Sequence, residues 1–290
     1  MTEQSCAFGE DGGLIGTICL PDADKWANMK TGVVLFNAGV VHRIGPHRIN
    51  VRLARRLAAK GIPSIRFDLA GQGDSARSRA SRAFEEQAVH DIRAAMDFFG
   101  STVKISKFVL FGFCSGGVHS YEAAKVDDRV KGLMIYDTFI YRTAWSRVNR
   151  YIIKFRSRGF VSTLIRWGRR RLKAIVGTMS PNTSSGASAA ASPQAGIFVQ
   201  PGRAEFSESL GRFARRGMRV LIVYSGSFEQ YNYRNQFSDA FREYAVNAAV
   251  TSAFLPAMDH TATLMERQQE FIAVIEQWCL DLNASLTGPA

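Results

Sequence analysis

The sequence predicts an α/β fold, with a mostly parallel central sheet, helices on both faces and an inserted helical lid. Seven apolar runs of strand length occur along the chain, and most are separated by segments with helical periodicity. The runs are largely continuous rather than alternating, which is typical of strands buried on both faces. With 290 residues, of which 46% are hydrophobic, the chain is long enough for one domain with a large core.

The predicted strands and helices alternate in the way that a parallel sheet requires. The strands are GLIGTICL (13–20), GVVLFN (32–37), PSIRFDL (63–69), KFVLFGF (107–113), KGLMIYD (131–137), MRVLIVYSG (218–226) and AVTSAFLP (249–256). The candidate helices cover residues 48–59, 84–99, 115–125, 204–215, 235–247 and 262–282. Parallel strands need crossover connections, which such helices supply.

Residues 138–204 interrupt this alternation and carry the excess charge of the chain. The formal net charge is +12, from 37 basic and 25 acidic residues. The interruption holds 12 basic and no acidic residues, which leaves 25 of each sign elsewhere. We expect such a basic segment to attract an acidic acyl-carrier protein, a phosphate-bearing thioester, an anionic glycan or an anionic membrane surface. The alternative is a solvated basic surface over an ordinary hydrophobic lid. Nucleic acid is not expected as a partner, because the chain shows no recognisable binding motif.

The composition of the interruption predicts a lid. Its first part, RTAWSRVNRYIIKFRSRGFVSTLIRWGRRRLKAIVG, mixes aromatic and aliphatic residues with arginines at roughly helical spacing. The following TMSPNTSSGASAAASPQAG is too poor in large apolar groups to offset its ordering entropy, so we expect a flexible Ser/Ala/Gly-rich loop. The predicted organisation is a core of residues 1–137 and 205–290 with a basic helical lid at 138–204.

The sequence lacks the patterns that indicate export, metal binding or dinucleotide binding. No stretch reaches 18 apolar residues, and the N-terminus lacks the pattern of a signal peptide, so we expect a cytoplasmic protein. The four cysteines form no CxxC or Cys/His ligand pattern. The Gly71-Gln72-Gly73 segment lacks the third glycine of a dinucleotide fingerprint. The sequence therefore predicts neither a metal nor a cofactor.

The best candidate for a nucleophile is Cys114, in the segment Gly112-Phe113-Cys114-Ser115-Gly116. A strand followed by G-x-nucleophile-x-G and a helix makes a sharp turn that exposes the central side chain. The helix N-terminus beside it offers unpaired N–H groups and partial positive charge, which favour a thiolate and an oxyanion.

The general base is predicted to be His260. It lies between the last predicted strand and the last predicted helix, where a loop can reach across the carboxyl edge of the sheet. The other histidines lack this placement and are expected on the surface or in packing, although two of them, His42 and His47, could line the site entrance; the remaining two are His90 and His119.

Two strand ends compete to supply the carboxylate that orients the imidazole. Asp137 ends the strand LMIYD, and Glu229 follows LIVYSGSF. Asp259 adjoins the histidine in sequence, which makes it a poor geometric partner, so we expect it to serve the loop or cap the helix.

The oxyanion hole needs two backbone donors. The predicted donors are the N–H groups of Ser115 and of Val40, in the loop after GVVLFN. A third loop, RFDLAGQGDS, is predicted to be a tight structural turn.

These motifs resemble the α/β-hydrolase superfamily over residues 10–137 and 205–282. The order of nucleophile, acid and histidine agrees with that superfamily, and NAGVVHRIGPHR with RFDLAGQGDS is similar to bacterial serine-aminopeptidase-like hydrolases, some of them associated with exosortase systems. Asp137, in MIYDTF, resembles the acid of polyketide-synthase thioesterase domains, and the resemblance therefore favours it over Glu229. Two features depart from the superfamily: Cys114 replaces the usual serine, as in dienelactone hydrolases, and Asn37-Ala38-Gly39 stands where many members have His-Gly.

The predicted function is therefore a cofactor-independent thioesterase or esterase that uses a Cys-His-Asp triad and an acyl-enzyme intermediate. Two alternatives stay open. The first is an acyltransferase with an acyl-carrier or acyl-CoA donor, because an acyl-thioester enzyme retains transfer potential. The second is a non-enzymatic binding protein on the same scaffold, since a fold alone does not establish activity.

Overall fold

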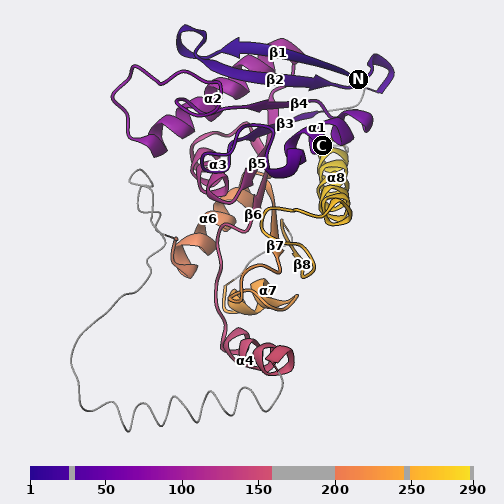
Figure 1. The fold of residues 1–290 in the computed structure, drawn as a ribbon. Coiled ribbons are helices and arrows are strands. Elements are labelled where there is room, and N and C mark those ends of the chain that lie inside the picture. The colour runs from indigo at the N-terminus through magenta and orange to yellow at the C-terminus, as the bar shows by residue number, and fades with distance from the viewer. Residues whose placement is uncertain (26–29, 159–199, 245–248, 288–290) are drawn as a thin grey trace, which may run out of the picture.

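A computed structural model describes residues 1–25, 30–158, 200–244 and 249–287. Within them, eight strands form one sheet in the order β1-β2-β4-β3-β5-β6-β7-β8 (Figure 1). Neighbouring strands from β4 to β8 are parallel, whereas β2 is antiparallel to both β1 and β4. The strands are β1 (Thr2–Phe8), β2 (Leu14–Leu20), β3 (Thr31–Phe36), β4 (Ser64–Phe67), β5 (Lys107–Phe113), β6 (Val130–Tyr136), β7 (Arg219–Ser225) and β8 (Val250–Leu255).

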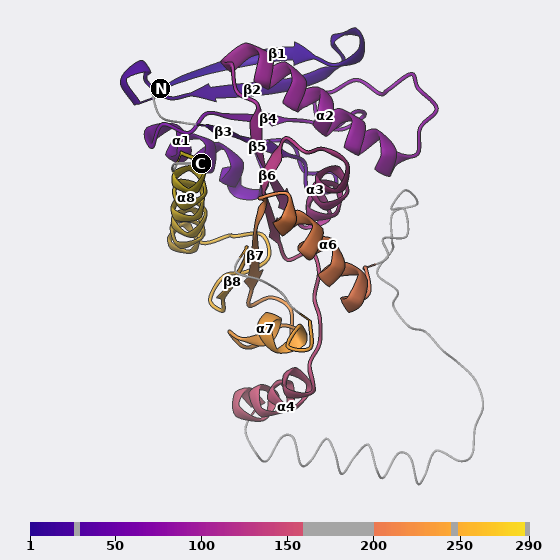
Figure 2. The ribbon, with the colours of Figure 1, turned by 180° about the vertical axis from the view of Figure 1, so that it is seen from behind.

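Helices cover both faces of the sheet, and the two opposite views in Figures 1 and 2 agree on their placement. α1 (Ile49–Ala59) and α8 (Met265–Thr287) lie on one face, while α2 (Phe84–Val103), α3 (Ser115–Val126) and α6 (Arg203–Arg215) lie on the other. The remaining described helices are α4 (Ala144–Arg158), α7 (Gln236–Ala240) and the short 3₁₀ turns Glu10–Gly12, Ala23–Lys25 and Pro46–Arg48.

Each face of the sheet has its own hydrophobic core. Leu53 of α1 and Phe271 and Trp278 of α8 belong to one cluster of buried side chains. Met96 of α2 and Phe206 of α6 belong to the other. The predicted fold class is therefore confirmed, because buried strands are covered by helices on both sides.

Two elements differ from the sequence prediction. β1 was not predicted, because Thr2–Phe8 is an edge strand whose residues are mostly exposed and mostly polar, so it lacks the apolar run of the central strands. α7 is much shorter than the predicted helix at 235–247, and residues 245–248 lie outside the described part. The predicted insertion at 138–204 contains α4. Residues 159–199 of this insertion lie outside the described part of the chain, so the boundaries and role of the lid stay a prediction.

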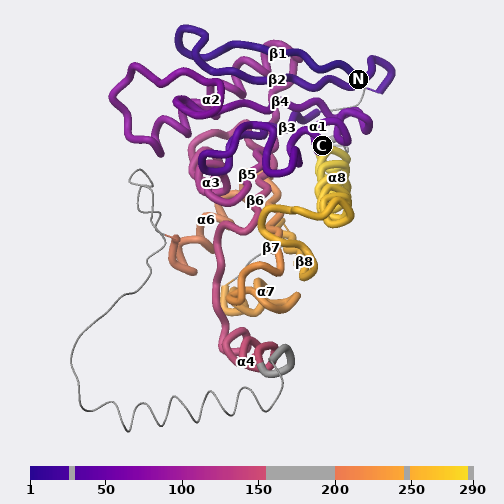
Figure 3. The backbone as a smooth tube through the Cα atoms, in the orientation of Figure 1, coloured from indigo at the N-terminus to yellow at the C-terminus, as the bar shows by residue number. Residues whose placement is uncertain are grey.

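The chain leaves β6 at Asp137 and runs to α4, which lies beyond α7 at the end of the molecule farthest from β1 (Figure 3). Thr143 and Ser146 form a reciprocal cap at the start of α4: the Ser146 amide donates to Thr143 Oγ1, and the Thr143 amide donates to Ser146 Oγ, both at 3.0 Å. This cap fixes where the helix begins.

The turn from β5 into α3 depends on glycine for close packing. A Cβ at Gly112 would lie 2.3 Å from the Cα of Gly117, and a Cβ at Gly117 would lie 2.0 Å from Oγ1 of Thr138. Neither distance is sterically possible, so glycine is required where strand and helix meet.

Replacing Gly112 by alanine should therefore lower the free energy of unfolding by about 3 kcal/mol, because the added methyl group overpacks this turn. Urea denaturation would measure the loss. Gly211→Ala is the matched control: it lies inside α6, where the added Cβ meets Arg215 Nη1 at an ordinary 3.6 Å, so it should raise stability by about 0.5–1 kcal/mol. Equal effects of the two substitutions would contradict the steric argument.

Candidate active site

Cys114 occupies the turn between β5 and α3 in a strained backbone conformation, with φ 54° and ψ −121°. β6 and the residues after it hold this conformation: the Cys114 amide donates to the Tyr136 carbonyl at 2.9 Å, and Thr138 Oγ1 donates to the Cys114 carbonyl at 2.8 Å. Such strain persists only where the surroundings impose it. The side chain is partly exposed.

His260 links this turn to the end of β6. Its Nδ1 lies 3.0 Å from Oδ2 of Asp137. The hydrogen bond to Asp137, followed by one to the side chain of Cys114, raises the pKa of His260 to about 10. The structure thus brings the three predicted residues together in the order Cys114, His260, Asp137.

Aromatic rings fix the plane of the imidazole. Tyr136 stacks on His260 with ring centres 6.0 Å apart and planes 12° apart, and Phe228 contacts it edge-on at 5.1 Å. Only 28% of the His260 side chain is exposed. The ring therefore has little freedom to turn away from Asp137.

Asp137 is buried and both of its carboxylate oxygens accept hydrogen bonds. The amide of Ser225, at the end of β7, donates to Oδ1 at 2.8 Å, and the Ser225 hydroxyl donates to Oδ2 at 2.6 Å. Because the oxygens act as acceptors, the Nδ1 of His260 must be the donor in its bond to Asp137. This leaves Nε2 for the sulfur of Cys114.

Ser225 and Ser227 close a ring of hydrogen bonds around the acid and the base. The Ser227 amide donates to Ser225 Oγ at 3.2 Å, and the His260 amide donates to Ser227 Oγ at 2.6 Å. Gly226, between the serines, donates to the carbonyls of Leu255 and Met258 at 3.1 and 3.0 Å, which ties β7 to the loop after β8. The ring therefore holds both the backbone and the side chain of His260.

The two competing acids lie elsewhere. Glu229 is 56% exposed and pairs with Lys154 of α4 at 2.6 Å. Asp259 accepts hydrogen bonds from the amides of Thr261 and Thr263 at 3.0 and 2.9 Å. Burial opposes ionisation there, but these bonds and those of the threonine hydroxyls hold the pKa of Asp259 at about 2. Asp259 thus serves the loop, as predicted.

The predicted oxyanion loop lies against the start of α3. Ala38 and Val41 pair across a tight turn that contains Gly39 and Val40. The Gly39 amide donates to the Ser115 hydroxyl at 2.8 Å, a contact that sequence reasoning missed. Ser115 is the first residue of α3, so its own amide is among the N–H groups that the helix leaves unpaired. Val40 is 89% exposed, and its role as second donor stays a prediction.

Residues 34–274 match the model of the family described as "Alpha/beta hydrolase family". This match covers most of the chain. The chain belongs to the alpha/beta hydrolase family.

Solved structures show the same fold at low sequence identity. Est1E from Butyrivibrio proteoclasticus superposes with a TM-score of 0.59 at 13% identity, covering 97% of this chain and 99% of its own. DcsB, in complex with its substrate analogue, gives 0.54 at 17% identity over 97% and 99%. XC6422 from Xanthomonas campestris, a serine hydrolase without a lid, gives 0.55 at 13% identity over 100% and 97%. No curated protein matches the sequence.

In this alpha/beta hydrolase, Asn37 follows β3 directly and leads into the predicted oxyanion loop. Its Nδ2 donates to the Val41 carbonyl at 2.7 Å and to Asp68 Oδ1 at 2.8 Å, while its Oδ1 accepts the Leu69 amide at 2.6 Å. The side chain is 1% exposed. Asn37 therefore joins the oxyanion loop to the loop after β4.

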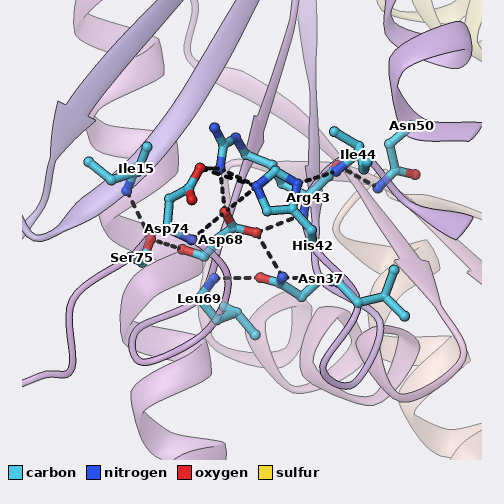
Figure 4. Close-up of polar contacts among 11 residues, drawn as sticks. Ile15, Asn37, His42, Arg43, Ile44, Asn50, Asp68, Leu69, Asp74 and Ser75 are labelled. Atoms are coloured by element: carbon cyan, nitrogen blue, oxygen red, sulfur yellow. Dashed lines mark hydrogen bonds and ion pairs between the residues drawn. The ribbon is translucent and has the colours of Figure 1, made fainter. Parts of the chain in front are cut away.

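Arg43 completes this link as an internal cation (Figure 4). Its Nη1 donates to the buried Asp68 and to Asp74 at 2.6 Å, and it lies 2.8 Å from Nε2 of His42. Side-chain atoms of His42, Asp68 and Asp74 lie close enough together to suggest a metal site. The guanidinium of Arg43 already contacts all three, so it supplies the positive charge of this cluster. Asp68, Asp74 and Ser75 thus serve the loop structurally, as predicted; Ser75 donates to the Asp68 carbonyl at 2.6 Å.

The other histidines have their contacts away from Cys114 and Asp137. His42 belongs to the Arg43 cluster, and His47 is exposed in a 3₁₀ turn. His90 faces Glu10 at 3.4 Å, and His119 is 8% exposed with its ring 5.3 Å from that of Phe84. None of these contacts joins a histidine to Cys114.

The pKa of His260 offers a direct test of this geometry. NMR titration of the His260 Cε1–H should show protonation persisting far above the ordinary 6.5, up to about 10. Asp137→Asn should return the pKa toward 6.5, because the imidazolium loses the carboxylate that stabilises it most. Glu229→Gln should leave it unchanged.

The raised pKa of His260 also makes the stability of the fold depend on pH. Because the folded pKa lies above the ordinary value, the His260–Asp137 pair stabilises the fold fully below pH 6.5, and this contribution is lost as pH rises through about 10. A His260 titration that did not respond to Asp137→Asn would contradict the contact.

Proposed function

We propose that this alpha/beta hydrolase cleaves a thioester or ester through an acyl-enzyme on Cys114, with His260 as base and Asp137 as the group that orients it. The observation that carries the proposal is the 3.0 Å contact of Nδ1 of His260 with Asp137. Asp137 first and then Cys114, at the strained strand-to-helix turn, raise the pKa of the same imidazole. The family match makes the chain an enzyme, which sets aside the alternative of a non-enzymatic binding protein.

The reaction divides into two balanced steps. In the first step, His260 holds the thiol proton and the sulfur of Cys114 forms a bond to the acyl carbon. The oxyanion of the tetrahedral intermediate accepts hydrogen bonds from the amide N–H groups of Ser115 and Val40. The bond to the leaving alcohol or thiol breaks, and His260 gives it the proton. In the second, His260 takes a proton from water, the water oxygen attacks the acyl carbon, and the C–S bond breaks to release the acid.

Cysteine suits this site because its thiolate is the reactive form and an adjacent imidazolium stabilises a thiolate. The raised pKa of His260 keeps its imidazole protonated at neutral pH. An acyl-thioester enzyme keeps its transfer potential, so transfer from an acyl-carrier or acyl-CoA donor to another acceptor is the second candidate function.

An ester substrate agrees with the family, whereas an acidic acyl-carrier partner at residues 138–204 stays a prediction, since most of that segment lies outside the described residues. Among the helices that the structure describes, none is both long and apolar enough to span a membrane.

Covalent labelling tests the nucleophile. Intact-protein mass spectrometry with activated acyl esters and acyl thioesters should show one acyl adduct, on Cys114, which Cys114→Ala abolishes. Cys19 and Cys279 are matched internal controls, because burial raises the pKa of each thiol. Normal turnover by a folded Cys114→Ala protein would overturn the covalent mechanism. Products formed with added amines or alcohols separate hydrolysis from transfer.

Steady-state kinetics test the acid. Asp137→Asn should lower kcat/KM about a hundredfold or more, because the imidazole loses its orienting partner. Glu229→Gln should change it less than about twofold, because that carboxylate is exposed and pairs with Lys154. A loss confined to Glu229→Gln would reverse the assignment.

A further inference from the structure

α4 presents apolar side chains to solvent. Trp145 is 51% exposed, Val148 49%, Tyr151 66% and Ile152 38%. Residues three and four apart on a helix share a face, so Trp145, Val148 and Ile152 form one stripe with Tyr151 at its margin. We call these four residues the α4 stripe.

α4 is attached to the body of the protein by a different face. Asn149 Nδ2 donates to Oδ1 of Asn232 at 3.1 Å, and Asn232 Nδ2 donates to the Ser146 carbonyl at 2.8 Å. Ser146 is 3% exposed. Helices of globular proteins normally bury the apolar face and expose the polar one. In α4, Ser146 and Asn149 make the attachment and the α4 stripe stays exposed. Ile153, which shares a face with these two polar residues, is 46% exposed.

Positive charge borders the stripe. Arg147, Arg150 and Lys154 lie on α4, which contains no acidic residue. The Arg150 guanidinium lies 5.5 Å from the ring centre of Tyr151, and Lys154 pairs with Glu229 at 2.6 Å. Among the described residues, Glu229 is the carboxylate with which one of these three cations, Lys154, forms an ion pair, so the surface around the stripe keeps a positive charge.

We infer that α4 is an interfacial helix whose stripe binds the surface of an anionic lipid bilayer. Basic amphipathic helices lie in the plane of such an interface, with the apolar face in the acyl boundary and the cations at the headgroups. Trp and Tyr are the side chains most enriched at that depth. A second copy of this chain on the same face would bring like charges together, and a nucleic acid would leave the stripe uncovered.

This surface is independent of the proposed chemistry but lies close to it in the chain. Only residues 138–143 separate Asp137 from the start of α4. The path is held by Tyr224, whose hydroxyl donates to the Phe139 carbonyl at 2.8 Å. A bilayer bound at α4 therefore lies at the end of a short, anchored connection to the site.

Vesicle cosedimentation of the full chain tests the inference. The protein should bind vesicles that contain phosphatidylglycerol and not vesicles of phosphatidylcholine alone, and added salt should weaken the binding. Val148→Asp should lower the partition coefficient about tenfold or more, because it places a charge in the apolar face. Arg147→Gln should lower it about fivefold, the effect of one cation near an anionic surface.

Matched controls lie elsewhere on the surface. Val126→Asp, on α3 at 62% exposure, and Arg79→Gln, whose side chain is 91% exposed, should both leave binding unchanged. Binding that survives Val148→Asp, or falls equally in the controls, would overturn the inference. So would a self-associating protein that Val148→Asp turns into a monomer while vesicle binding is absent, because the stripe would then be a contact between copies. Circular dichroism and the Tm establish that each variant is folded.

Discussion

The hydrogen bond between His260 and Asp137 is the interaction on which the proposed site depends. The two residues are 123 positions apart in sequence and meet only because β6, β7 and β8 are neighbouring parallel strands. Their carboxyl ends therefore share one edge of the sheet. The placement of His260 against Asp137 is therefore set by the pairing of these strands, whereas the local turn after β5 places Cys114.

Ser225 and Ser227, at and just after the end of β7, fix the direction of the hydrogen bonds around Asp137 and His260. Ser225 donates its hydroxyl to Asp137 and accepts the Ser227 amide, so the direction of each bond in the ring is fixed. With both carboxylate oxygens acting as acceptors, the imidazole has one tautomer that completes the ring when it is neutral. The acid thus comes from β6, while β7 contributes the hydroxyl groups that hold it.

Residue pattern and family resemblance were sufficient to predict Cys114, His260 and Asp137, because each follows a strand at the same sheet edge. The residue pattern alone could not rank Asp137 above Glu229, because that choice depends on how β6 and β7 pair. The family resemblance decided it. Ser225, Ser227 and Arg43 were missed for a related reason: serines and arginines are common in loops, and their roles appear only once distant loops meet. β1 escaped prediction because an exposed edge strand has no apolar run to detect.

The strands that carry the three residues of the proposed triad differ in how firmly the sheet holds them. β5 and β6, which carry Cys114 and Asp137, have paired strands on both sides, whereas β8 ends the described sheet and its residues are mostly only half-buried. Opening of edge elements requires less free energy than global unfolding. Fraying that starts at β8 would move the imidazole of His260 away and leave Cys114 and Asp137 in place. Heating would then abolish the proposed activity at a lower temperature than global unfolding.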